Sequence, residues 1–294
     1  MTTSRRTALS LLPAAAALAL GAQPAAATAP RAGSARGRGR RHPAILVSGD
    51  STAATYAAHE APRAGWGQAL EVFLPPVVAV RNHAWSGAST KSFADSGRLD
   101  RLLAEVCEGD VVLVSFGHND SKQEDPARYT DPWGTYQQHL ARFADGARAR
   151  GGVPVVVTPV ERRRFDADGR ARESHGDYPA AARALAAREG IALVDLTALS
   201  LQLWNSLGPD GTTSAFLHLA PGESANHPAG VVDNTHFRAA GAIELARTVA
   251  SELDRQRIVR PGTVVGLHRQ HVPEDALTWP AQRPAEVAPP AALP

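Results

Sequence analysis

The sequence predicts an α/β fold, a three-layer αβα sandwich around a five-stranded parallel sheet. Short aliphatic or β-branched runs alternate with longer amphipathic stretches, and this alternation is typical of parallel strands whose connecting helices cover both faces. The final amphipathic stretch also carries an apolar stripe at helical spacing, which indicates core packing. The expected strands are residues 44–48, 77–81, 111–116, 153–158 and 191–194. The expected helices are residues 67–73, 99–107, 135–150, 178–189 and 239–253.

The composition is that of a soluble globular protein. The 294 residues are 44% hydrophobic and 20% charged, which excludes collagen-like, disordered and coiled-coil classes. The single cysteine, Cys107, excludes an intrachain disulfide framework and a multi-cysteine metal site. We expect it to be a buried small apolar residue.

Both ends of the chain differ from its middle. Residues 1–29 have a charged start, a short apolar run and a small-residue cleavage candidate, the pattern of an export signal. The Arg5-Arg6 pair resembles a twin-arginine leader, although an ordinary secretory signal remains an alternative. The apolar run is too short to span a bilayer. Residues 30–43 read as a flexible basic linker, residues 44–255 as the α/β domain, and residues 256–294 as a Pro/Ala-rich tail on the domain or disordered.

The net charge of +2 does not indicate a nucleic-acid partner once it is divided along the chain. Residues 1–43 hold seven arginines and no acids, and residues 256–294 hold four arginines and three acids. The domain between them is left with 20 basic and 26 acidic residues. A net-acidic domain does not fit a protein that binds phosphate backbones.

Candidate functional residues follow the expected strands, because ligands of open parallel sheets bind at the carboxyl ends of the strands. Ser51 follows the first strand in a Gly-Asp-Ser turn and is a candidate nucleophile, or simply a helix cap. Gly87 follows the second strand and can present its N–H to a carbonyl, or is a plain turn glycine. Asn119 follows the third strand, where its amide can donate to an oxyanion or to the loop backbone.

Asp233 and His236 come directly before the last expected helix. An Asp three residues before a His can fold back to one ring nitrogen, fixing the tautomer and stabilising the imidazolium that forms during proton transfer. The alternative is an Asp that caps the helix beside a surface His.

Taken together, these motifs resemble the SGNH (GDSL-like) hydrolase superfamily, over residues 45–253 and in the same order. The motifs are Gly49-Asp50-Ser51, Gly87, Gly117-His118-Asn119-Asp120 and Asp233-Asn234-Thr235-His236. Further matches resemble the rhamnogalacturonan acetylesterase branch, namely Thr52, Gly65-Trp66-Gly67-Gln68, Thr158-Pro159-Val160, Arg162, Phe165 and Phe237. One departure is Ala88, where the branch commonly has Arg, and it weakens the substrate assignment only.

The resemblance implies a flavodoxin-like sandwich and a secreted serine esterase that removes O-acetyl groups from a plant cell-wall polysaccharide, most readily pectin. It implies a triad of Ser51, Asp233 and His236, with Ser51, Gly87 and Asn119 as oxyanion donors. The expected protein is a monomer that needs no cofactor. A metal site is not expected either, because none of its eleven histidines has the paired helical spacing of metal ligands.

Substrate contacts are expected from Trp85, His118 and Arg162. Arg162 belongs to a Glu-Arg-Arg-Arg run that can bind a sugar carboxylate; alternatively these arginines are solvated or pair with nearby acids, namely Asp166, Asp168 and Glu173. Three tryptophans near strand ends, Trp66, Trp85 and Trp133, can stack on sugar rings or pack in the interior.

Two other functions remain open. One is an SGNH lipase or thioesterase, which calls for an apolar trough, whereas the candidate loops are rich in polar residues. The other is a non-catalytic carbohydrate-binding protein, against which the full set of triad residues argues. An esterase that stays attached to the cell envelope also remains an alternative to a released one.

Overall fold

Residues 42–283 are described by the structure, a computed structural model, and they lie within the unit His42–Pro294. The expected export signal and all but the last two residues of the expected linker lie outside the described residues, as do residues 284–294. The expected division of the chain into these segments stays a prediction. No helix formed by residues 42–283 has the length and apolar character needed to cross a membrane.

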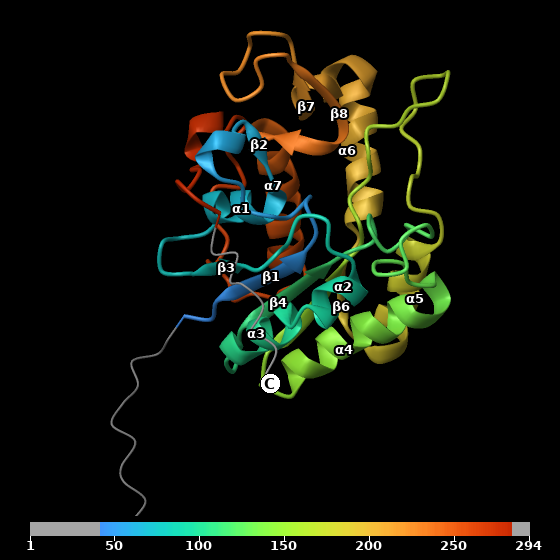
Figure 1. The fold of residues 1–294 in the computed structure, drawn as a ribbon. Helices are drawn as coiled ribbons and strands as arrows, with labels where there is room; N and C mark the ends of the chain where they lie inside the picture. Colours follow the sequence, from blue (N-terminus) through green and yellow to red (C-terminus); the bar gives the residue numbers. More distant parts are fainter. Residues whose placement is uncertain (1–41, 284–294) are drawn as a thin grey trace, which may run out of the picture. The chain divides into compact units, whose positions relative to one another are not determined.

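A five-stranded, all-parallel sheet lies between layers of helices (Figure 1). Its strand order is β3-β1-β4-β5-β6, the doubly wound order of flavodoxin-like folds. The predicted fold class is therefore confirmed. The strands are β1 (Ile45–Gly49), β3 (Val80–Asn82), β4 (Val111–Ser115), β5 (Val153–Val157) and β6 (Ala192–Val194).

The central strands are continuously apolar because both faces of the sheet are covered. Successive residues of a strand point to opposite faces, and β4 shows the result: Val111 and Leu113 belong to one buried cluster, Val112 and Val114 to another. The first cluster includes α1 and α7, and the second includes α3, α4 and α5. These helices are α1 (Trp66–Ala69), α3 (Arg98–Glu105), α4 (Gln137–Arg148), α5 (Tyr178–Glu189) and α7 (Ala239–Arg255).

Several elements differ from the expected ones. The structure adds α2 (Thr90–Asp95) and α6 (Leu196–Gly211), whose mixed polar and apolar residues gave no clear helical period. α1 is a single turn that continues as the 3-10 helix η2 (Leu70–Phe73). The expected strand 77–81 is displaced to Val80–Asn82, because Val78 N–H donates to the carbonyl of Pro75 and closes a turn there.

A second sheet was not expected. It is antiparallel, in the order β2-β8-β7, and consists of β2 (Arg63–Ala64), β7 (Phe216–Leu219) and β8 (Val231–Arg238). β8 is largely polar, which hid it from a search for apolar runs. The two residues expected before the last helix, Asp233 and His236, thus lie on a strand that leads directly into α7.

The segment after α7 packs against the first cluster through Val259, Val272 and Leu277, all buried. This segment also contacts the part of the chain that follows Ser51. The Gln68 side chain donates to Thr278 O, 2.9 Å away, and Trp279 Nε1 donates to Arg63 O, 2.8 Å away. Residues 256–283 therefore hold the segment that contains α1 and β2.

The expectation that Cys107 is buried is wrong. Its side chain is exposed, because α3 ends at Glu105 and the buried position at the end of the helix is taken by Val106.

Candidate active site

The turn after β1 places Ser51 at the carboxyl end of the sheet. A Cβ at Gly49 would come within 2.8 Å of the carbonyl oxygen of Ser115 on β4, so the close approach requires glycine. Asp50 then fixes the turn, because its Oδ1 accepts hydrogen bonds from the N–H and the hydroxyl of Thr52, 2.9 and 2.7 Å away. Ser51 itself is 8% exposed.

His236 lies between Ser51 and Asp233. Its Nε2 is 2.9 Å from Ser51 Oγ, and its Nδ1 is 2.7 Å from Asp233 Oδ2. The other carboxylate oxygen of Asp233 accepts from the backbone N–H of Thr235 and of His236, at 2.7 and 3.0 Å. The carboxylate is therefore fixed by its own strand, and the three side chains form one hydrogen-bonded chain.

The charge of Asp233 is strongly favoured in this setting. Partial burial raises the pKa of its carboxyl group, but the hydrogen bonds and charge of His236, together with the two backbone N–H groups, outweigh burial and hold the pKa well below its usual range. An ionised carboxylate on Nδ1 keeps Nε2 available to accept a proton from the serine hydroxyl.

The residues expected as oxyanion donors lie on neighbouring loops. Asn119, buried, donates through Nδ2 to the carbonyl of Ala88 at 2.9 Å, which ties its loop to the one that contains Gly87. Gly87 has φ +83°, a conformation that favours glycine. Within residues 42–283, no hydrogen bond engages the N–H of Ser51 or of Gly87. One amide hydrogen of Asn119 therefore bonds to the loop backbone. The second amide hydrogen is left as a donor for an oxyanion.

His118 is placed differently from the expectation that it contacts substrate. It is 4% exposed; its Nδ1 lies 3.2 Å from Asp50 Oδ2 and its ring packs edge-on against His175, with centroids 4.3 Å apart. Burial lowers the pKa of His118. His118 is therefore part of a buried polar layer under the serine turn, and the sequence did not reveal this because the layer is formed by long-range contacts.

Arg162 lies beside the triad strand. Its guanidinium donates to the hydroxyl of Thr235, the residue between Asn234 and His236. Within residues 42–283 no ion pair joins the arginines of this run to Asp166, Asp168 or Glu173, and Asp166 instead contacts Arg172 at 3.4 Å. A sugar contact of Arg162 stays a prediction, but its position links the loop after β5 to β8.

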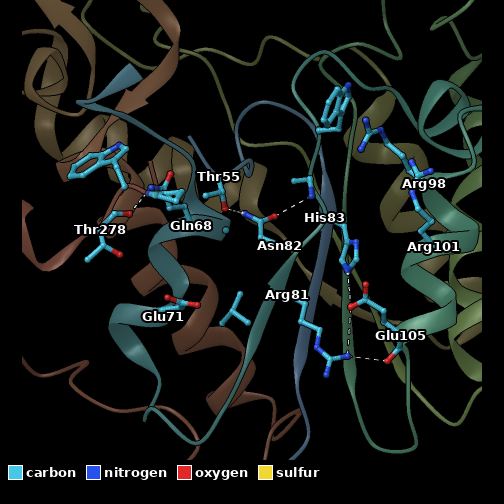
Figure 2. A pocket seen from close by; sticks show the side chains of 16 residues that line it. Thr55, Gln68, Glu71, Arg81, Asn82, His83, Arg98, Arg101, Glu105 and Thr278 are labelled. Atoms are coloured by element: carbon cyan, nitrogen blue, oxygen red, sulfur yellow. Dashed lines mark hydrogen bonds and ion pairs between the residues drawn. The ribbon is translucent and has the colours of Figure 1, made fainter. Parts of the chain in front are cut away.

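The tryptophans separate into three environments. Trp66 is fully buried and so follows the alternative of interior packing, whereas Trp133 is 52% exposed. Trp85 is half-buried and lines a pocket of about 660 Å³ at the edge of the sheet (Figure 2). The guanidinium of Arg98 stacks on the Trp85 ring at 3.3 Å from its centroid.

Two residues around the triad were missed from the sequence. The hydroxyl of Tyr56 donates to the carbonyl of Ser51 at 2.7 Å, and Thr235 accepts from Arg162. Tyr56 gave no signal, because its contact depends on how the chain turns after Ser51. Thr235 could have been suspected, since it lies within the Asp-x-x-His motif.

Residues 42–283 contain no group of three or more His, Cys, Asp or Glu side chains placed to hold a metal ion. The expectation of a reaction without metal or cofactor stays a prediction.

Comparison with known proteins agrees with this geometry. The model of the GDSL-like lipase/acylhydrolase family matches residues 47–242, a span that includes Ser51, Gly87, Asn119, Asp233 and His236. The chain belongs to this family. The resemblance to SGNH hydrolases is thereby confirmed, as is the prediction that the protein is an ester-hydrolysing enzyme.

Relatives in Bacillus subtilis (strain 168) specify the branch. The chain is 44% identical to rhamnogalacturonan acetylesterase RhgT over 210 residues, which are 71% of this chain and 89% of that protein. It is 36% identical to the probable rhamnogalacturonan acetylesterase YesY over 206 residues, 70% of this chain and 90% of that protein. The predicted resemblance to this branch is confirmed.

Among solved structures, the chain is similar to YxiM of Bacillus subtilis, with a TM-score of 0.64 and 28% identity. The similarity covers 74% of this chain and 58% of that one. The chain therefore spans little more than half of YxiM.

Proposed function

We propose that this protein is a secreted esterase that removes O-acetyl groups from rhamnogalacturonan through an acetyl-serine intermediate. The observation that carries the proposal is the position of His236, within hydrogen-bond distance of both Ser51 Oγ and Asp233. The substrate class is supported by the 44% identity to RhgT, a rhamnogalacturonan acetylesterase.

In the first half of the reaction, Ser51 Oγ attacks the acetyl carbonyl carbon while His236 Nε2 takes the hydroxyl proton. Asp233 holds the imidazole and stabilises its positive charge. The N–H groups of Ser51 and Gly87 and the side-chain amide of Asn119 stabilise the oxyanion. His236 then gives its proton to the sugar oxygen as the ester C–O bond breaks.

In the second half, water attacks the acetyl-serine. His236 takes a proton from the water, the same donors stabilise the second oxyanion, and the proton returns to Ser51 Oγ as acetate leaves. Apart from the substrate and this water, each step uses only side chains and backbone groups of this chain.

A lipase or thioesterase is the alternative within the same family. The 660 Å³ pocket beside the site is lined by charged and polar side chains, among them Arg81, Asn82, His83 and Arg98, and this favours a sugar ester over a long acyl chain. The two functions differ in one simple measurement: turnover on aryl esters that rises with acyl-chain length contradicts the proposal.

The test of the proposal is acetate release by the processed protein from acetylated pectin, xylan, mannan and chitin fragments. We expect release from the pectic fragments to be fastest, and Ser51→Ala to abolish it. Release from none of the fragments, with activity on long acyl esters, would establish the lipase alternative. Export is tested separately by fractionating the producing cells and their medium: activity in the medium supports a released enzyme, and activity only on the cells an attached one.

A further inference from the structure

The turn that contains the nucleophile is not followed directly by a helix. β1 ends at Gly49, and the next helical element is the 3-10 helix η1 (Ala58–Glu60). In an α-helix, the carbonyl of each early residue accepts a hydrogen bond from the N–H four residues later. Within residues 42–283, no backbone N–H donates to the carbonyl of Ser51. The backbone of Ser51 therefore depends on side chains for its position.

The side chain of Tyr56 provides the missing donor. Its hydroxyl donates to Ser51 O at 2.7 Å, and the residue is fully buried. The same peptide group is held at its other end, because the N–H of Thr52 donates to Asp50 Oδ1 at 2.9 Å. The peptide group that follows the nucleophile is thus fixed on both sides, and this restricts the backbone of Ser51.

Tyr56 also contacts the loop of the second oxyanion donor. Burial raises the pKa of its phenol, although the charge of Arg63 and a hydrogen bond with the side chain of Ser86 act in the opposite direction. Ser86 directly precedes Gly87. One buried hydroxyl therefore contacts both segments that provide a backbone N–H to the oxyanion.

Contacts from three parts of the chain fix Tyr56 itself. Its backbone N–H donates to Gln68 Oε1 at 3.0 Å, and Gln68 Nε2 donates in turn to Thr278 O at 2.9 Å (Figure 2). The guanidinium groups of Arg63 and Arg283 lie 4.4 and 5.0 Å from the centre of the tyrosine ring, at the distances of cation–π contacts. Tyr56 is therefore held from α1, from β2 and from the segment after α7.

Tyr56 is not placed to act on the substrate directly. The residue has no exposed surface, and its hydroxyl bonds to the carbonyl of Ser51, whereas Ser51 Oγ is bonded to His236. Tyr56 can therefore affect the reaction only through the position of the groups that it holds. Such an effect can be large, because a displacement of about 1 Å at a reacting group can lower a rate by about a hundredfold.

We propose that Tyr56 is a positioning residue for ester hydrolysis. By holding the Ser51 carbonyl, it keeps Ser51 Oγ within reach of His236 and keeps the Ser51 N–H directed at the oxyanion. The proposal rests on the serine mechanism of the proposed function, but not on the identity of the sugar. It also gives the segment after α7 a part in the reaction, because that segment holds Tyr56.

The test is Tyr56→Phe, which removes the hydroxyl and leaves the buried ring. The full-length protein is inactivated with an aryl phosphonate, which Ser51 Oγ attacks in a single step without deacylation. We expect the maximal rate of inactivation, kinact, to fall about tenfold or more, and kcat/KM on an aryl acetate to fall with it. The inhibitor constant KI is expected to stay unchanged, since Tyr56 does not contact the ligand. Unchanged kinact and kcat/KM overturn the proposal.

The matched control is Tyr136→Phe. Tyr136 is also buried, and its hydroxyl also donates to a backbone carbonyl, that of Phe116, at 2.9 Å. The control variant loses the same kind of hydrogen bond outside the serine turn, so its free energy of unfolding should fall about as much as in Tyr56→Phe. We expect it to keep the kinact of the wild type. An equal loss of kinact in both variants overturns the proposal, since the loss would then follow from removing any buried hydroxyl.

These measurements separate the role of Tyr56 from the proposed function. An enzyme that releases no acetate from pectic fragments, yet loses kinact in Tyr56→Phe, keeps the positioning role and loses the proposed substrate. An enzyme that releases acetate, with the same kinact in Tyr56→Phe and wild type, keeps the proposed function and loses the role of Tyr56. Phosphonate attached to a residue other than Ser51, as located by mass spectrometry, overturns both.

Discussion

His236 Nε2 lies 2.9 Å from Ser51 Oγ, although 185 positions separate the two residues in the sequence. The two β-sheets together bring these residues into contact. The parallel sheet presents Ser51 at the carboxyl end of β1, and the small antiparallel sheet holds β8 through β2, which follows Ser51 by about a dozen residues. The second sheet is thus the physical link between nucleophile and base.

Asp233→Asn is expected to lower kcat on an aryl acetate by about 10³- to 10⁴-fold, because an amide on Nδ1 favours the wrong imidazole tautomer. The KM is expected to change little. The exposed Asp168→Asn serves as the control and should retain wild-type kcat. A loss of less than tenfold in Asp233→Asn would mean that the carboxylate does not orient His236.

Asn119→Ala is expected to lower kcat by about 10²- to 10³-fold, the usual effect of removing one oxyanion donor. Because Asn119 also donates to Ala88, the free energy of unfolding must be measured alongside. A variant that loses stability yet keeps its kcat would show that Asn119 serves only the loop.

The sequence could predict the sheet and the positions of Ser51 and Asn119 for a shared reason. Parallel strands buried on both faces are short apolar runs, and the polar residues that follow them, such as Ser51 and Asn119, stand out against those runs. β8 could not be predicted in the same way, since most of its residues are polar and it forms no apolar run. The sequence left open whether the tail lies on the domain, because the hydrogen bond from Trp279 to Arg63 joins segments that no local pattern connects.

Stability is expected to decrease as the pH rises from about 4 towards 7, through Asp120. Burial raises the pKa of this carboxyl group to about 7 against hydrogen bonds from Thr90 and Thr130 that lower it. A carboxyl group whose pKa is raised in the folded state binds its proton more tightly there than in the unfolded chain. Its contribution to stability is therefore complete below the pKa that it has in the unfolded chain, and is lost as the pH rises through the pKa that it has in the folded state. Urea unfolding across this range should show a shallower pH dependence in Asp120→Asn. Identical pH dependence in both proteins would contradict the assignment.

Leu277→Ala is expected to lower the free energy of unfolding by about 2–3 kcal/mol, since the side chain is 5% exposed and packs in the core. Val265→Ala, at a position 37% exposed in the same segment, is the control and should change it by less than about 0.5 kcal/mol. Equal stability of Leu277→Ala and wild type would mean that the segment after α7 does not stabilise the domain.

The most direct test of the central claim is to look for the acyl-enzyme itself. The protein is mixed with an excess of aryl acetate, quenched in acid within its first turnovers, digested and analysed by mass spectrometry. We predict one acetyl group on the peptide that contains Ser51, and none on the corresponding peptide of Ser51→Ala. Turnover without any acetyl group on Ser51, or turnover that persists in Ser51→Ala, would contradict the mechanism.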